Sequence, residues 1–305
     1  MGKLPIWLVD RIHEKHIAND QQYRIDCTLQ WAEGNPITIQ KILNSYIEYS
    51  DKVVFCFLIG DIETTFNIPE NVRLYRTSLL KSKQVRNEFV LPYIWEFLER
   101  GFEPLERTDM PHVGFCGMPS HYRKKTLDIF KDCNKIQTNY IYIPQFHSGH
   151  VHNETVAVNN DTSRDFSQRF YKNIEETHFT VCNRGNGNFS MRFYQTLSCG
   201  RIPILLDTDT VLPFSDEIAW EEIIVIAENE EKLLQRVFDY WAKNDIVAMQ
   251  KKCRDIYETY FMGTRFIDKV IDDEMSIVAM KKKCRNAYEY FFMSTRSRNT
   301  GENKT

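Results

Sequence analysis

Short apolar runs alternate with amphipathic segments along most of the chain. The runs are β-branched or aromatic and end at turn residues, as buried strands do, while the amphipathic segments repeat apolar side chains at helical spacing. In the first third, this pattern predicts strands at 6–9, 53–59 and 72–75, and helices at 37–49 and 87–99. In the remainder, it predicts strands at 113–116, 140–143, 179–182, 202–206 and 223–227, and helices at 123–130, 166–175, 191–199 and 230–241. Such alternation is typical of α/β layers with mainly parallel sheets.

A polar, proline-bounded segment at 103–111 separates the two runs of alternation. We therefore predict two Rossmann-like domains facing a cleft, followed by extra C-terminal helices. The predicted boundaries are 1–108, 109–243, 244–296 for the helices, and 297–305 for a disordered tail. Residues 246–254 recur almost unchanged at 277–285, which we interpret as a duplicated packing or capping helix, with partner binding as the alternative.

Composition narrows the range of partners. The chain has 305 residues with 39 basic and 42 acidic side chains, a net charge of −3, which argues against nucleic acid as the main partner. None of the eight cysteines forms a C-x-x-C pair, so we expect reduced, buried thiols. No apolar run approaches the ~20 residues of a membrane span, and the first residues lack the apolar core of a signal peptide. These features predict a cytoplasmic protein.

The segment 179–195 carries the most chemical information. A buried strand leads into a Gly- and Asn-rich loop and then into a helix whose expected N-cap is Ser190. A helix N-terminus offers free N–H groups and the positive end of its dipole, so this arrangement predicts an anion site. We expect Gly185 and Gly187 to adopt positive φ and approach a ligand closely. We expect Arg184 and Arg192 to face the cleft and neutralise a diphosphate.

Residue patterns alone leave other interpretations open. A tight turn with two surface arginines would explain the same loop. The absence of Gly-Lys-Ser/Thr excludes a P-loop NTPase. A dinucleotide fingerprint would need a third glycine where Ser190 stands, but Asp207 and Asp209 fall near its acidic position, so a nicotinamide-dependent oxidoreductase stays open.

Longer motifs resemble a known family. Arg184-Gly-x-Gly-x-x-Ser190-x-Arg192-Phe193 is followed by Gly-Arg-Ile-Pro at 200–203, Leu-Pro-Phe at 212–214 and then Trp220. This series resembles the exostosin family, glycosyltransferase family 47, in the soluble type found in bacteria and large DNA viruses. Phe115-Cys-Gly117 followed by Arg123 resembles the preceding block of the family more loosely. The first 105 residues match only in general character.

The resemblance implies a GT-B-like fold and an inverting glycosyltransferase. The donor would carry xylose or another UDP-linked sugar, and the acceptor would be a glycan or glycoprotein. No cofactor would be required, and a divalent metal would be possible but not essential. Gln195 stands where the family usually has a ribose-binding Glu, which keeps a catalytically inactive glycan- or nucleotide-binding module as an alternative. The implied donor-binding residues are Gly117, Arg123, Arg184, Gly185, Asn186, Gly187, Asn188, Ser190, Arg192 and Gln195.

Inverting transfer needs a base for the acceptor hydroxyl, and carboxylates at the carboxyl ends of N-terminal strands are suitable. The candidates are Asp61, Asp10 and Glu63, although Asp61 would equally suit a turn cap.

Two further patterns could suggest metal ligands. We interpret His147, His150 and His152 as a polar loop, because only Glu154 accompanies them and no cysteine is near. Asp207-Thr-Asp209 resembles a metal-binding D-x-D, but we favour turn capping. The sequence therefore predicts no metal site.

Overall fold

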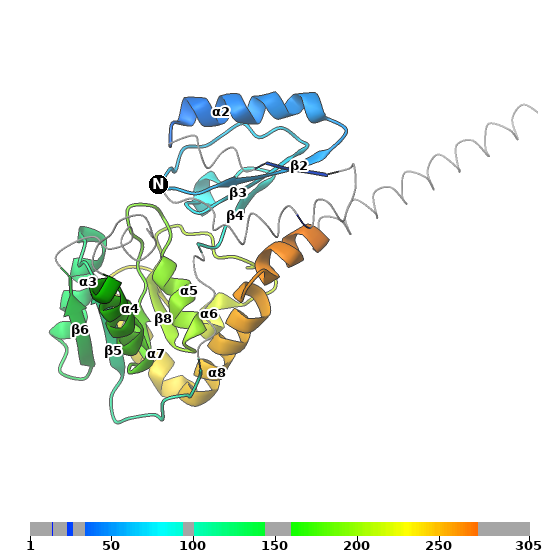
Figure 1. The fold of residues 1–305 in the computed structure, drawn as a ribbon. Helices are drawn as coiled ribbons and strands as arrows, with labels where there is room; N and C mark the ends of the chain where they lie inside the picture. The colour runs from blue at the N-terminus through cyan, green and yellow to red at the C-terminus, as the bar shows by residue number, and fades with distance from the viewer. Residues whose placement is uncertain (1–13, 15–22, 27–33, 94–100, 144–159, 274–305) are drawn as a thin grey trace, which may run out of the picture.

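The computed structural model describes residues 14, 23–26, 34–93, 101–143 and 160–273, without the side chains of 23–26 and 160–165. Within them lie two parallel β-sheets, each covered by helices, one sheet above the other in Figure 1. The predicted arrangement of two α/β domains is therefore confirmed. Several predicted features lie outside the described residues, namely the strand at 6–9, Asp10, the histidines at 147, 150 and 152, the second repeat copy at 277–285, and the tail at 297–305.

The N-terminal sheet has four parallel strands in chain order: β1 (Tyr23–Asp26), β2 (Val53–Leu58), β3 (Val72–Arg76) and β4 (Glu88–Val90). Helix α2 (Pro36–Ser45) covers one face and continues as a 3-10 turn to Tyr49. The helix begins at Asn35, whose side chain accepts the N–H groups of Ile37 and Thr38, and Pro36 follows where its missing donor costs nothing.

The helix predicted over 87–99 is wrong where the structure describes it, because residues 88–90 form β4. Glu88 pairs with Arg76 on the neighbouring strand at 2.8 Å, and the side chains are 1% and 3% exposed. Phe89 stacks on Tyr75 with ring centroids 5.1 Å apart. These cross-strand contacts outweigh the local helical spacing. Strand β1 was missed because its four residues alternate without a buried apolar run.

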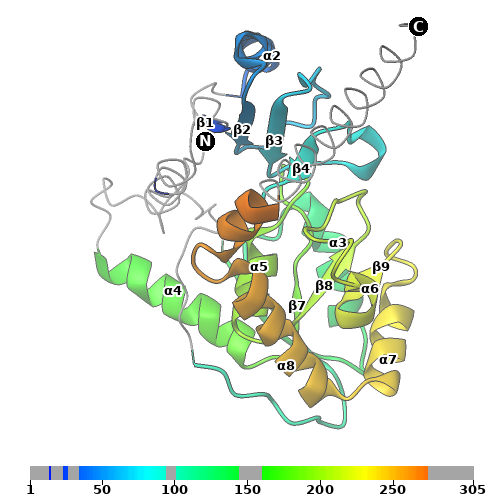
Figure 2. The ribbon, with the colours of Figure 1, turned by 90° about the vertical axis from the view of Figure 1, so that its right-hand side faces the viewer.

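The C-terminal sheet has five parallel strands in the order β6-β5-β7-β8-β9. Its strands are β5 (His112–Gly117), β6 (Gln137–Tyr142), β7 (Phe179–Val181), β8 (Ile202–Leu206) and β9 (Val225–Ala227). Its helices are α3 (His121–Lys131), α4 (Asn160–Glu175), α5 (Met191–Ser198), α6 (Trp220–Ile223) and α7 (Leu233–Lys243). The predicted elements are confirmed apart from their ends, since Ile223 closes α6 instead of opening β9. Figure 2 shows α3 and α7 on one side of this sheet and α4 and α5 on the other.

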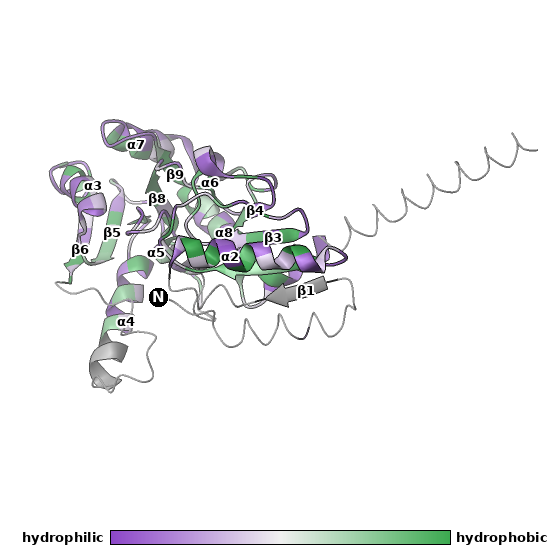
Figure 3. Cartoon of the chain, turned by 90° about the horizontal axis from the view of Figure 1, so that it is seen from above, coloured by the Kyte–Doolittle hydropathy of each residue, from purple (hydrophilic) through white to green (hydrophobic). Residues whose placement is uncertain are grey.

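The chain returns to the N-terminal domain after the second sheet. Helix α8 (Ile246–Ile256) packs on α5 and continues through a π-helical turn (Tyr257–Phe261) into the C-terminal core. The following helical residues, including Phe266 and Ile267, then pack against Phe55 and Phe57 on the open face of the N-terminal sheet. Helices therefore cover both faces of that sheet. Figure 3 shows β8 in the green of hydrophobic residues, as expected for a strand covered on both faces.

The two domains touch at the Gly-rich loop and at the turn after β8. Leu80 forms an isolated antiparallel bridge with Thr210, and the Asp209 carboxylate accepts the Ser82 N–H at 3.1 Å. None of the six cysteines within the described segments is in a disulfide, and all but Cys133 are buried, as predicted. None of the helices in those segments is long and apolar enough to cross a membrane.

Candidate active site

The order of the C-terminal strands locates a natural ligand site. In a doubly wound sheet, ligands bind outside the carboxyl ends of strands where the direction of winding reverses. Here that point lies between β5 and β7, which pair directly although β6 lies between them in the chain. Strand β5 ends at Gly117, and β7 leads into the loop at 183–190. Both predicted donor-binding blocks therefore meet at one position.

Arg192 lies in the gap between these two strand ends. Its Nη2 donates to the carbonyl of Cys116 at 2.8 Å and its Nη1 to that of Val181 at 3.5 Å, while the guanidinium stacks 4.4 Å from the Phe115 ring and 5.6 Å from that of Phe170. Its Nε is buried without a hydrogen-bond partner. The prediction that Arg192 faces an open cleft is wrong, because α5 turns it inward and leaves it only 7% exposed. Burial lowers the pKa of this guanidinium.

Gly117 makes room for Arg192. Its backbone has a φ of +147°, and a Cβ there would lie 2.7 Å from Arg192 Nη2. Both the backbone conformation and the space therefore require glycine at this position.

Arg123 on α3 is a second cation at the same strand ends. Its Nε donates to the Asn183 carbonyl at 3.3 Å, and its Nη2 lies 3.6 Å from where a Cβ of Gly185 would be. Burial, and to a smaller extent the positive charge of Arg192, lower its pKa to about 9. Neither guanidinium forms an ion pair with a carboxylate of the described segments. The site therefore has two partly or fully desolvated positive charges and no protein counterion.

Arg184 lies at the cleft and is held by the opposite domain. Its Nη2 lies 2.5 Å from Glu63 Oε1, and the guanidinium stacks over Tyr122 at 4.9 Å. Nη2 also donates to the carbonyl of Asn186, and Nε donates to that of Gly185 at 3.4 Å. These contacts fix the plane of the group at 12% side-chain exposure.

The loop glycines do not have the role predicted for them. Neither Gly185 nor Gly187 has a positive φ. Gly187 is required for another reason, since a Cβ there would lie 2.5 Å from the Phe189 ring and 2.6 Å from Asp61 Oδ1. The same distance shows that Asp61, an exposed residue, reaches the loop from the N-terminal domain.

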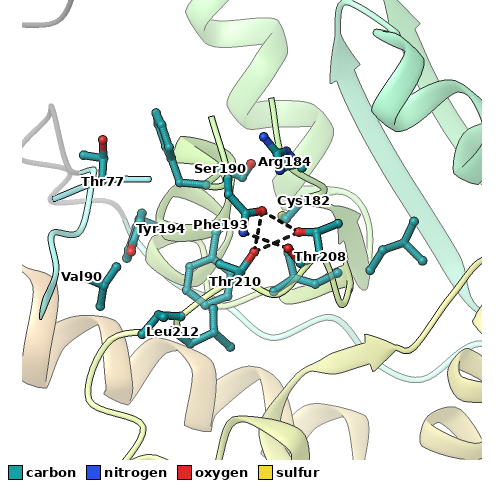
Figure 4. A pocket seen from close by; sticks show the side chains of 15 residues that line it. Thr77, Val90, Cys182, Arg184, Ser190, Phe193, Tyr194, Thr208, Thr210 and Leu212 are labelled. Atoms are coloured by element: carbon teal, nitrogen blue, oxygen red, sulfur yellow. Dashed lines mark hydrogen bonds between the residues drawn. The ribbon is translucent and has the colours of Figure 1, made fainter. Parts of the chain in front are cut away.

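Ser190 occupies the predicted N-cap position of α5 with an extended backbone, but its hydroxyl makes no capping bond. The Oγ atom is buried without a hydrogen-bond partner and lines a cavity between the domains. Figure 4 shows this cavity, whose wall includes Arg184, Tyr194 and, from the N-terminal domain, Thr77. It holds about 420 Å³ of empty space, part of it open to solvent. The unpartnered hydroxyl is available to a ligand there.

Asn188 holds the loop in place. Its amide donates to the Thr208 carbonyl at 2.9 Å, and its Oδ1 accepts the hydroxyls of Thr208 and Thr210, the two threonines labelled in Figure 4. Its backbone N–H donates to Ser78 Oγ at 2.7 Å. Both polar atoms of the Asn188 side chain thus hold the loop, and its predicted contact with the donor stays a prediction. Asn186 is exposed.

The other predicted residues differ in their surroundings. Gln195 is half-buried and donates to the Tyr171 hydroxyl at 3.2 Å. Asp207 Oδ1 accepts the N–H of Asp209, whose φ is +64°, so the predicted turn capping is confirmed. Within the described part of the chain, no three His, Cys, Asp or Glu side chains converge on a common metal position.

Sequence reasoning missed three residues that contact the site, namely Tyr122, Thr77 and Ser78. Thr77 and Ser78 directly follow β3, so the rule that ligands meet strand ends could have found them. Cys182, by contrast, lines the cavity but burial raises its pKa to about 11, which keeps it a neutral thiol.

Comparison with known proteins places this geometry in a family. The model of the exostosin GT47 domain matches residues 53–238. The chain is 37% identical over 78 residues to the "Probable glucuronosyltransferase GUT1" of Oryza sativa subsp. japonica, a match covering 25% of this chain and 19% of that protein. It is 35% identical over 71 residues to the "Probable beta-1,4-xylosyltransferase IRX10" of Arabidopsis thaliana, covering 23% and 17%. The matches thus span about a fifth of those curated relatives.

Among solved structures, the chain is similar to WaaG, a glycosyltransferase involved in lipopolysaccharide biosynthesis. The similarity covers 84% of this chain and 92% of that one, with 8% identity and a TM-score of 0.38. The fold assignment follows from the two parallel sheets themselves.

Proposed function

We propose, on the premise that this chain belongs to the exostosin GT47 family, that it transfers a sugar from a nucleotide-diphosphate donor to a glycan or glycoprotein acceptor with inversion at the anomeric carbon. The sugar would be a UDP-linked one such as xylose. The names of the relatives include both a xylosyl- and a glucuronosyltransferase, so the donor has to be identified by experiment.

One observation carries the proposal: Arg192, which is buried, and Arg123, which is half-buried, lie at the strand ends without a carboxylate partner in the described segments. Two such cations repel each other and are poorly solvated, so an anion bound between them would be strongly favoured. A diphosphate fits this requirement, because its charge is compact and its oxygens accept charge-assisted hydrogen bonds. Arg184 would extend the site towards the N-terminal domain.

The leaving diphosphate can be stabilised by these arginines and by the N-terminus of α5 in place of a divalent metal. We therefore propose that a metal is possible but not essential. Asp61 is our first candidate for the base, because it faces the Gly-rich loop from the opposite domain and has no ion-pair partner among the described residues. Glu63 is second, since Arg184 already occupies its carboxylate. A cytoplasmic location stays a prediction.

The test is UDP binding by calorimetry together with UDP release from a panel of UDP-sugars with glycan acceptors. Arg184→Ala should cost about 2–3 kcal/mol of UDP affinity, because a charge-assisted contact is lost. Lys124→Ala is the control, since Lys124 is exposed on α3 and pairs with Asp128. Equal UDP affinity in the wild type, in Arg184→Ala and in Arg192→Ala would refute the anion site.

The alternative is a glycan- or nucleotide-binding module without turnover, which the neutral Gln195 favours. Such a module would bind UDP normally yet release none from any UDP-sugar. Thermal stabilisation by NAD(P) instead of UDP would indicate an oxidoreductase.

A further inference from the structure

The loop at 60–64 carries both acidic candidates and is held by consecutive residues at the end of β3. Arg76 donates from Nη1 to the Thr64 carbonyl at 2.8 Å and from Nη2 to the Ile62 carbonyl, so it holds the carbonyl groups of both residues that flank Glu63. Thr77 Oγ1 both accepts the Gly60 N–H at 3.1 Å and donates to the Gly60 carbonyl at 2.9 Å. The backbone of the loop is therefore fixed from one strand end.

Arg76 is itself held by a buried partner. Glu88 on β4 accepts from its Nη1 at 2.8 Å, and the other oxygen of Glu88 accepts the Val85 N–H at 3.1 Å. Such a pair, 3% and 1% exposed, adds little to stability but strongly restricts geometry. Glu63 is thus presented to the cleft from a rigid support.

Across the domain interface, Glu63 meets Arg184 at 2.5 Å. Only Nη2 of Arg184 is used for this contact, and Nη1 has no hydrogen-bond partner among the residues described. A guanidinium that is fixed in its plane, with one nitrogen left over, loses less freedom when it binds an anion than a mobile one.

We propose that Glu63 is a positioning residue, which orients Arg184 for the donor diphosphate, and that Arg76 and Glu88 hold Glu63 in place for this purpose. The inference rests on the proposed function, because it takes Arg184 as a diphosphate ligand. It also removes Glu63 from the candidates for the catalytic base.

The direction in which the UDP Kd changes on removing Glu63 distinguishes a positioning role from simple charge repulsion and from a catalytic base. A carboxylate near an anion site repels the ligand, so simple electrostatics predicts that removing Glu63 tightens UDP binding. Positioning predicts the opposite: Glu63→Ala should raise the UDP Kd about tenfold, and Glu63→Gln, which keeps a hydrogen-bond acceptor, only about threefold. A catalytic base would leave the UDP Kd unchanged and lower turnover alone.

The experiment is a double-mutant cycle of Glu63→Ala and Arg184→Ala, with UDP Kd measured by calorimetry. If Glu63 acts through Arg184, its removal has no further effect in the Arg184→Ala background. Glu70→Ala is the matched control, an exposed acid before β3 whose side chain is outside the cleft contacts, and it should leave the Kd unchanged.

Arg76→Lys keeps the positive charge but loses the planar guanidinium that donates to two carbonyls at once. It should therefore raise the UDP Kd, as Glu63→Ala does. Because Arg76 is buried, thermal unfolding is used first to check that the Arg76→Lys variant folds. An unchanged or lower Kd in Glu63→Ala, or an effect that adds fully to that of Arg184→Ala, would overturn the inference while leaving the proposed function intact. Absence of UDP binding by the wild type would overturn both.

Discussion

Replacing Arg192 by methionine should separate its contribution to ligand binding from its contribution to the fold. Methionine has a similar length and is apolar, so it can fill the space between the rings of Phe115 and Phe170. The guanidinium lost in this change makes one good hydrogen bond, to the Cys116 carbonyl at 2.8 Å, and a longer one to Val181 at 3.5 Å.

The expected magnitudes follow from these contacts. Losing one charged hydrogen bond costs about 1.5–3 kcal/mol. Removing a desolvated charge with an unpartnered Nε returns several kcal/mol, as when buried ionic groups are replaced by apolar ones. We therefore expect the free energy of unfolding of Arg192→Met to fall by less than about 1 kcal/mol or to rise. The UDP Kd should rise roughly 30- to 150-fold, equivalent to about 2–3 kcal/mol.

Arg201 is the matched control. It is also buried, at 4% exposure, but all three of its guanidinium nitrogens have hydrogen-bond acceptors, whereas Nε of Arg192 has none. Its three nitrogens donate to backbone carbonyls of Glu103, Glu175, Cys199 and Gly200. Arg201→Met leaves these carbonyls without donors, so it should lower the free energy of unfolding by about 3 kcal/mol or more.

The assays are urea unfolding and UDP calorimetry on both variants. If Arg192→Met destabilises the fold as much as Arg201→Met while binding UDP normally, Arg192 is a structural strap between β5 and β7, and the reasoning from uncompensated charge is refuted.

Three further predictions test other parts of the molecule. Asp61→Asn should lower turnover about 100-fold with unchanged UDP Kd, and near-normal turnover would exclude Asp61 as the base. Transfer should persist in EDTA, whereas complete loss restored by Mn²⁺ would contradict a metal-independent mechanism. Burial lowers the pKa of His178 from its ordinary 6.5, and its Nδ1 accepts the His112 N–H, so protonation is disfavoured in the fold. Its stabilising effect is then full above pH 6.5 and is lost as pH falls below that value, so His178→Gln should unfold with less pH dependence in thermal melts between pH 5 and 8.

Strands β2, β5, β7 and β8 could be predicted from sequence because each is a short apolar run that ends at a turn residue and is buried on both faces. Strand β4 could not be predicted, because its apolar residue Phe89 is exposed while its charged residue Glu88 is buried. Glu88 is buried because it pairs with Arg76 on β3. The spacing of apolar residues within one segment contains no information about a partner on another strand.

The motif around Arg184 predicted where the site lies but not which way its side chains point. Whether Arg192 faces solvent or core depends on where α5 begins and on rings supplied by β5 and α4, which are distant in the sequence. The contact of Arg184 with Glu63 joins residues 121 positions apart and exists only because the domains meet there. Sequence patterns within one loop contain neither fact.

Arg192 and Arg123, the two poorly solvated arginines at the strand ends, explain why ligand binding should be tightly linked to stability in this fold. A domain shaped for stability alone would place an apolar side chain or a carboxylate where Arg192 or Arg123 now stands. Burial lowers the pKa of both guanidinium groups, and the charge of Arg192 also contributes to the lowered pKa of Arg123. A bound diphosphate reverses the sign of both effects, because it supplies the missing countercharge. UDP should therefore raise the melting temperature by the amount that its Kd dictates, and in Arg192→Met this rise should shrink more than the unliganded melting temperature changes.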